Sequence, residues 1–157
     1  MADEHRGVKI GDRVPDFSLP DQSGKMTNFR EVAGGKVVVL YFYPKDFTPG
    51  CTTEACAFRD NYDIFLSAGA MVVGISDDSP ETHMQFSLRY HLQFLLLSDE
   101  DNTVRNLFGV TPTLGFIPGR TTFIIDKQGT VRYIFSSQFN PKKHIAESIR
   151  IIKSLSR

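Results

Sequence analysis

The sequence has little of three features that would assign it to a particular class of protein. Lysine plus arginine and aspartate plus glutamate each number 18, so no net charge attracts nucleic acid or an anionic membrane. The longest apolar run, Val37 to Tyr43, is too short to span a bilayer. Only two cysteines occur among 157 residues, which is too few for a disulfide scaffold and indicates reactive thiols in a reducing compartment.

Signals for export and for cofactors are also missing. The first residues lack the apolar segment of a secretory signal, so we expect a cytoplasmic protein. The four histidines are scattered and do not combine with the cysteines into a zinc-binding pattern. No glycine-rich dinucleotide or phosphate loop is present. We therefore expect no metal and no nucleotide cofactor, and a single domain over residues 1–157.

The hydrophobic pattern predicts strands that alternate with helices. We expect a short hairpin from residues 17–19 and 26–29, and strands at 37–43, 71–76, 94–97, 121–125 and 130–135. Helices are expected at about 51–69, 79–91, 102–108 and 141–155. This order predicts the α/β class, with a central mixed sheet flanked by helices on both faces.

Cys51 lies where a buried strand gives way to a helix. The free N–H groups and the dipole of a helix start favour a negative charge. Helix starts lower the pKa of a cysteine from about 8.5 to roughly 3.5 to 7.5. We therefore expect Cys51 to be a reactive thiolate, and the alternative is a small buried apolar side chain.

Cys56 follows on the polar face of the same helix, with Arg59, Asp60 and Asp63, where a core cysteine would not be placed. In an ideal helix the two cysteine Cα atoms lie about 8.6 Å apart, beyond the roughly 7 Å limit for a disulfide. If the two sulfurs pair, the first turns of the helix must unwind. The spacing thus indicates a two-step mechanism, in which one cysteine reacts in the folded state and the other forms a disulfide with it after local unfolding.

These residues resemble the active site of the peroxiredoxins, and the resemblance extends from about Gly11 to Leu155. The residues that carry it are Pro44, Thr48, Cys51, Glu54 and Arg120. A second cysteine five positions after the first, at Cys56, is similar to the peroxiredoxin Q group, also called bacterioferritin comigratory protein. The resemblance implies a thioredoxin-like fold with an N-terminal hairpin extension.

The resemblance also implies a role for each residue. Cys51 would attack a peroxide and become a sulfenic acid, and Cys56 would then form an intramolecular disulfide with it. Arg120 would stabilise the thiolate and hold the peroxide, and Glu54 would orient Arg120. Thr48 would hydrogen-bond to the peroxide, and Pro44 would shield the thiolate from water. Arg120 could instead form a surface salt bridge, and Glu54 could simply be a carboxylate that favours the helix start. Thr48 could be a turn residue, and Pro44 could be a proline that ends the strand.

The expected partners are hydrogen peroxide or organic hydroperoxides and a dithiol reductant, thioredoxin or a similar protein. The chain lacks the Gly-Gly-Leu-Gly and C-terminal Tyr-Phe motifs of the dimeric members, so a monomer is expected. The alternative functions are a one-cysteine peroxidase, a redox sensor or binding module, and a thiol-disulfide oxidoreductase. The last is disfavoured because such enzymes usually carry Cys-x-x-Cys, whereas this chain has Cys-x4-Cys. Organellar members exist, so the mature form of a plastid protein is the alternative to a cytoplasmic one.

Overall fold

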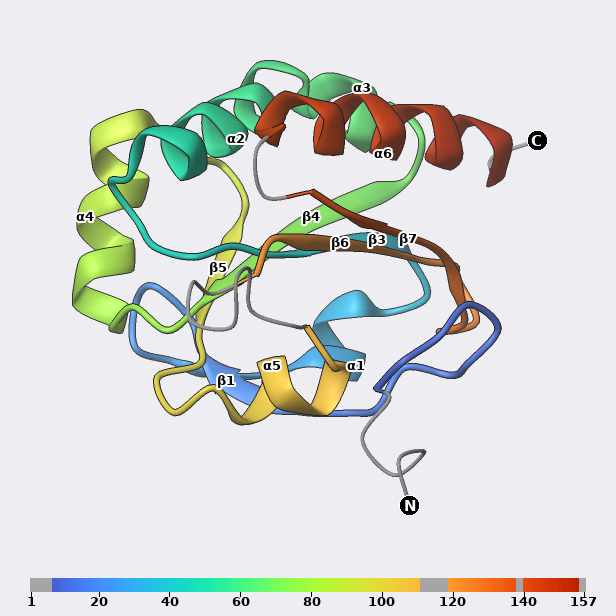
Figure 1. Ribbon diagram of the computed structural model, residues 1–157, viewed down its shortest axis with the longest axis horizontal. Helices are drawn as coiled ribbons and strands as arrows, with labels where there is room; N and C mark the ends of the chain where they lie inside the picture. The colour runs from blue at the N-terminus through green and yellow to red at the C-terminus, as the bar shows by residue number, and fades with distance from the viewer. Residues whose placement is uncertain (1–6, 111–118, 138–139, 156–157) are drawn as a thin grey trace.

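The computed structural model describes residues 7–110, 119–137 and 140–155, and its centre is a five-stranded sheet (Figure 1). The strands lie in the order β5-β4-β3-β6-β7. Their bounds are β3 (Val37–Phe42), β4 (Ala70–Ser76), β5 (Leu95–Ser98), β6 (Thr121–Ile125) and β7 (Val131–Ser136). Because β3 pairs parallel with β4 and antiparallel with β6, the expected mixed sheet is confirmed.

Strand β3 is central because both of its faces are apolar. All six of its residues are buried. Val39 and Tyr41 belong to the core under one layer of helices, and Val38, Leu40 and Phe42 belong to the core on the opposite face. This two-residue alternation, with β-branched and aromatic side chains on both sides, is what a strand between two helical layers requires.

Helices cover both faces of the sheet, as expected (Figure 1). One layer contains α2 (Pro49–Asp60), α3 (Tyr62–Ser67), α4 (Pro80–Tyr90) and α6 (Pro141–Leu155). The other face carries α1 (Phe29–Ala33), α5 (Thr103–Phe108) and the hairpin of β1 (Ser18–Pro20) and β2 (Met26–Asn28). In the described parts of the chain, none of the helices combines the length and the apolar character needed to cross a bilayer.

The sequence was wrong about two helices. Helix α1 was not predicted, because residues 26–29 were expected to form the second strand of the hairpin, whereas the Asn28 side chain accepts from the Glu31 N–H and starts a helix at Phe29.

The single helix expected over residues 51–69 is broken at Asn61, which ends α2 and precedes α3. The Asn61 side chain donates to the carbonyl of Ala57 across 2.8 Å, and its backbone has left the helical region. Asparagine competes for backbone hydrogen bonds in this way, which is why it interrupts helices.

Local signals placed the starts of α4 and α6 correctly. The Ser79 hydroxyl accepts from the Thr82 backbone N–H at the start of α4, and Pro80 occupies the first helical position. Pro141 likewise begins α6, whose buried face includes Ile145 and Ile152. These caps fix where α4 and α6 begin against the sheet.

Candidate active site

Cys51 lies in the first turn of α2, directly beyond the carboxyl end of β3, as the sequence predicted. Thr48 is the N-cap residue, and its carbonyl accepts from the Thr52 N–H across 2.9 Å. Pro49 occupies the first helical turn, where its missing N–H costs nothing. The Cys51 side chain is 1% exposed. The thiol is therefore held at a buried helix start.

Arg120 is brought to Cys51 by the pairing of β6 with β3. Thr121 lies opposite Phe42 in this antiparallel pair, so the residue before Thr121 lies beside the loop that follows Phe42. The Arg120 guanidinium donates from Nη2 to the Cys51 sulfur across 3.4 Å, and the residue is 4% exposed. A permanent cation therefore faces the thiol inside the protein.

Gly50 makes this approach possible. A Cβ atom on Gly50 would lie 3.0 Å from Nη2 of Arg120, closer than nine in ten real Cβ contacts, so the guanidinium would have to move by a few tenths of an ångström. Because Gly50 has no side chain, the guanidinium can lie against the helix start.

Glu54, one turn after Cys51, forms a buried ion pair with Arg120 through Oε1 and Nη1. This contact, together with that to the Cys51 sulfur, holds the planar guanidinium between the carboxylate and the thiol. Burial raises the pKa of Glu54 to about 8, although the charge of Arg120 acts in the opposite direction. The second carboxylate oxygen, Oε2, has no hydrogen-bond partner among the described residues.

The protonation of Cys51 differs from the expectation. Burial raises the pKa of the Cys51 thiol above its ordinary value, whereas Arg120, a hydrogen bond from the Lys45 backbone and the Thr48 hydroxyl lower it. The prediction of a lowered pKa was wrong for this closed state, because it counted the helix start and left out the loss of water around the sulfur. The neighbouring donors therefore offset part of the cost of forming a thiolate.

Thr48 and Pro44 belong to the loop that leads to Cys51. Both are half-buried in the loop that joins β3 to α2. The Thr48 hydroxyl donates to the Lys45 carbonyl across 2.8 Å. Phe47, between them, is 46% exposed and packs edge-on against Phe86 of α4. The sequence also suggests that Phe116 and Ile117 line the approach to the thiol, but both lie outside the described residues.

Comparison with known proteins identifies this arrangement. Residues 10–134 match the model of the AhpC/TSA family. The chain belongs to the AhpC/TSA family. It is 51% identical over 149 residues to "Peroxiredoxin Q, chloroplastic" of Triticum aestivum, a match that covers 94% of this chain and 68% of the relative. The homologue from Populus jackii is 50% identical, with 94% and 70% covered.

Solved structures agree with this assignment. Peroxidoxin BcpB from Mycobacterium tuberculosis superposes with a TM-score of 0.87 at 39% identity, covering 94% of this chain and 98% of that one. Peroxiredoxin Q from Xanthomonas campestris superposes with a TM-score of 0.82 at 30% identity, covering 90% of this chain and 92% of that one. The predicted thioredoxin-like fold, the peroxiredoxin Q resemblance and the thiol peroxidase activity are thereby confirmed.

The wheat and poplar relatives are chloroplastic proteins by name. This agrees with the plastid alternative considered from the sequence and gives no support to the cytoplasmic expectation.

The second cysteine of this peroxiredoxin lies away from the first. Cys56 is half-buried on α2, and both cysteines are free thiols. Arg59, one turn further on, donates to the Tyr90 carbonyl at the end of α4 across 2.8 Å. The later turns of α2 are therefore tied to α4, whereas the disulfide would require the earlier turns to open.

Two buried neighbours of the site were missed in the sequence. Arg105 of α5 is buried and donates to the carbonyls of Gly119 and Tyr43 across 2.7 and 2.8 Å. It thus fixes the backbone just before Arg120 and just before Pro44. An arginine in a short helix gives no local signal of this role, because both contacts are long-range.

His144 of α6 is the other missed residue. Its Nδ1 lies 3.7 Å from Oε2 of Glu54 and 2.7 Å from the Thr122 hydroxyl, and Nε2 lies 2.9 Å from the Ser137 carbonyl. Burial lowers the pKa of His144 to about 4, so the ring is neutral at pH 7. The sequence showed only four dispersed histidines, and nothing local marked this one.

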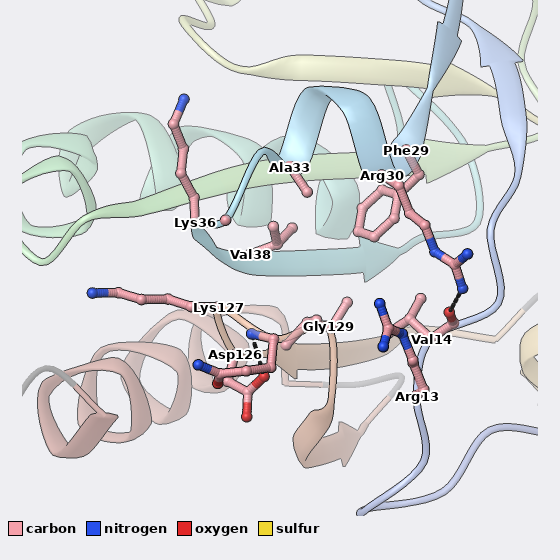
Figure 2. A pocket seen from close by; sticks show the side chains of 13 residues that line it. Arg13, Val14, Phe29, Arg30, Ala33, Lys36, Val38, Asp126, Lys127 and Gly129 are labelled. Carbon is pink, nitrogen blue, oxygen red and sulfur yellow. Dashed lines mark hydrogen bonds between the residues drawn. The ribbon is translucent and has the colours of Figure 1, made fainter.

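A separate cavity of about 170 Å³ lies at the opposite end of β3 (Figure 2). Its floor includes Val38, near the start of β3, and its rim carries Arg13, Arg30, Lys36 and Lys127. None of the predicted site residues lines it. The Cys51 thiol is instead at the carboxyl end of the central strand, where sites in open α/β sheets usually form.

Proposed function

We propose that this chain is a two-cysteine thiol peroxidase that reduces hydrogen peroxide and organic hydroperoxides, with Cys51 as the peroxidatic and Cys56 as the resolving residue. The observation that supports this most is the contact of Arg120 with the Cys51 sulfur across 3.4 Å at a helix start. A thiol peroxidase needs a nucleophilic sulfur beside fixed donors, and both are combined there.

In the first step the Cys51 thiolate attacks the terminal oxygen of the peroxide. A lone pair of the sulfur forms the new S–O bond, the O–O bond breaks, and its bonding pair leaves with the departing oxygen, so the sulfur is oxidised by two electrons and the peroxide is reduced. That oxygen takes a proton and departs as water or an alcohol, which leaves Cys51 as a sulfenic acid. In this proposal Arg120 stabilises the growing negative charge and Glu54 orients it, which the contacts of Arg120 with the Cys51 sulfur and with Glu54 support.

In the second step the Cys56 thiolate attacks the Cys51 sulfur. An S–S bond forms and the S–O bond breaks, so the hydroxyl leaves as water after taking a proton. Because five helical residues separate the Cα atoms by about 8.6 Å, the first turns of α2 must open for this step. The free state of both thiols is the starting point of such a cycle.

In the third step an external dithiol reduces the disulfide by exchange. We propose thioredoxin or a similar protein for this role, acting on a monomer. A plastid location is proposed from the names of the plant relatives. Immunolocalisation in the source cell tests the location, and sedimentation velocity of the reduced protein tests the monomer.

Steady-state turnover distinguishes this function from its rivals. Wild type, Cys51→Ser and Cys56→Ser are supplied with peroxide, thioredoxin, its reductase and NADPH. We expect many turnovers for wild type, none for Cys51→Ser, and loss of thioredoxin-driven turnover for Cys56→Ser. Wild-type turnover by Cys56→Ser would establish a one-cysteine peroxidase, and a single equivalent consumed by wild type would favour a sensor.

A further inference from the structure

A buried polar cluster lies behind the loop that joins β3 to α2. Its members come from three parts of the fold: the loop itself, the end of β4 and helix α4. All of them are buried: Tyr43, Asp46, Ser76, Asp78 and His83. None is among the residues that the peroxidase mechanism uses, so the cluster requires a separate explanation.

His83 joins the loop to the helices and the sheet. Its Nδ1 lies 2.6 Å from Oδ2 of Asp46, and its Nε2 lies 3.1 Å from the Leu97 carbonyl in β5. The Tyr43 hydroxyl donates to the other carboxylate oxygen of Asp46 across 2.5 Å. Both oxygens of Asp46 are therefore engaged, one by the Tyr43 hydroxyl and the other by the His83 ring.

Asp78 fixes the backbone of the same loop. Its Oδ2 accepts from the Asp46 backbone N–H across 2.8 Å and from the Ser76 hydroxyl across 2.6 Å. The potential ligand atoms of Asp46, Asp78 and His83 lie within 4.8 Å of one another. Protein donors already engage the carboxylate oxygens that point into the cluster, so it is a hydrogen-bond network rather than a metal site.

The loop held by this network reaches the reactive thiol. Lys45 gives a backbone hydrogen bond to the Cys51 sulfur, and Thr48 begins α2. Between them Phe47 has a φ of 67°, in the left-handed region that a bulky residue rarely adopts. Such a conformation persists only where surrounding contacts impose it, and the Asp46 contacts lie immediately before it.

We infer that His83 is a positioning residue, which through Asp46 holds loop 44–48 in the conformation that presents Cys51 to peroxide and opposes the unwinding of α2. This inference rests on the proposed two-cysteine function. The network does not touch the sulfur, so it acts on the chemistry through the loop alone. Its contacts favour the state that reacts with peroxide over the opened state that forms the disulfide.

The two chemical steps should then respond to His83 in different directions. Without the ring, the loop loses its link to α4 and β5, and the attacking sulfur is less well placed. A misplacement of about 1 Å can cost roughly a hundredfold in rate, so we expect peroxide oxidation to slow by about tenfold to a hundredfold. Disulfide formation, which needs the loop and helix to open, should proceed as fast as in wild type or faster.

The experiment uses His83→Gln, with Tyr43→Phe as a milder variant that removes a single hydroxyl from the network. Reduced protein is mixed with one equivalent of hydrogen peroxide and quenched, and intact masses give the rates of sulfenic acid and disulfide formation. Amide hydrogen exchange at residues 45–48 reports the order of the loop. We expect faster exchange there in His83→Gln, with a smaller change in Tyr43→Phe.

Two control variants separate positioning from general loss of stability. His91→Asn changes an exposed histidine at the left-handed C-cap of the same helix, a conformation that asparagine tolerates. Ile152→Val removes one buried methyl group from α6, which lowers overall stability without touching the loop. Both should keep the wild-type rate of peroxide oxidation.

Three results would overturn the inference: unchanged oxidation in His83→Gln, equal slowing of both steps, or the same kinetic pattern in Ile152→Val. If His83→Gln does not fold, Tyr43→Phe decides by the same two rates. Failure of the proposed function would look different, because wild type itself would then not oxidise at Cys51.

Discussion

The guanidinium of Arg120 lies 3.4 Å from the sulfur of Cys51, although 69 positions separate the two residues. Strand pairing explains this, because Thr121, at the start of β6, lies opposite Phe42, at the end of β3. The segment that precedes β6 therefore lies beside the loop that follows β3. Glu54 completes the arrangement from the next turn of α2. The site is thus built from two chain segments, one that follows β3 and one that precedes β6.

Replacement of Arg120 by glutamine should impair the attack on peroxide. The loss of one donor from a site of developing negative charge typically costs about 10² to 10³ in rate. Because the charge of Arg120 lowers the pKa of Cys51, the variant should also show a higher thiol pKa. Stopped-flow oxidation and thiolate absorbance against pH measure the two effects.

Arg150→Gln is the matched control for this change. Arg150 is exposed on α6 and pairs with Glu147 across 2.8 Å. The Arg150→Gln variant should keep the wild-type rate of oxidation by peroxide and the wild-type pKa of the Cys51 thiol. A wild-type oxidation rate in Arg120→Gln would contradict the assigned role of Arg120.

Replacement of Gly50 by alanine should displace Arg120 without damaging the helix. The added Cβ would lie 3.0 Å from Nη2, so the guanidinium must shift by a few tenths of an ångström. We expect oxidation to slow by about tenfold, because reactivity depends steeply on placement. Thermal unfolding should change little, since alanine favours a helix over glycine. An unchanged oxidation rate in a folded variant would show that the close approach is unimportant.

The buried neutral ring of His144 should make the fold sensitive to acid. Its folded pKa of about 4 lies below the ordinary 6.5, so the unfolded chain binds the proton more readily between these values. Stability is therefore lost as the pH falls from 6.5 to 4, by about 3 kcal/mol at the lower end.

Urea unfolding of wild type and His144→Asn at several pH values measures this contribution. The variant should lose less stability between pH 6.5 and 4 than wild type, and His91→Asn, at an exposed position, should keep the wild-type slope. Parallel pH profiles for wild type and His144→Asn would rule out the role of the buried ring.

Local patterns in the sequence predicted most of the fold. The apolar run of β3, the Ser79–Pro80 start of α4 and the Asp126–Gly129 turn are short-range signals, and each element formed as expected. The break at Asn61 was missed because the apolar spacing continues across it. That the whole chain is one domain stays a prediction.

The site was predictable only in part. Cys51 and Cys56 stood out by their positions on one helix, whereas the role of Arg120 came from family resemblance. Asp46 and His83 lie 37 residues apart, and Arg105 lies 62 residues from Tyr43, so neither contact leaves a local pattern. The direction in which the pKa of Cys51 shifts was also missed, because burial, which raises it, is a property of the packed structure.

The most direct test is rapid mixing of the reduced protein with one equivalent of hydrogen peroxide, followed by thiol counting and intact mass for wild type, Cys51→Ser and Cys56→Ser. The two-cysteine mechanism predicts fast loss of both thiols in wild type, arrest at a sulfenic acid in Cys56→Ser and no reaction in Cys51→Ser. Oxidation of Cys51 no faster than that of a free thiol would contradict it.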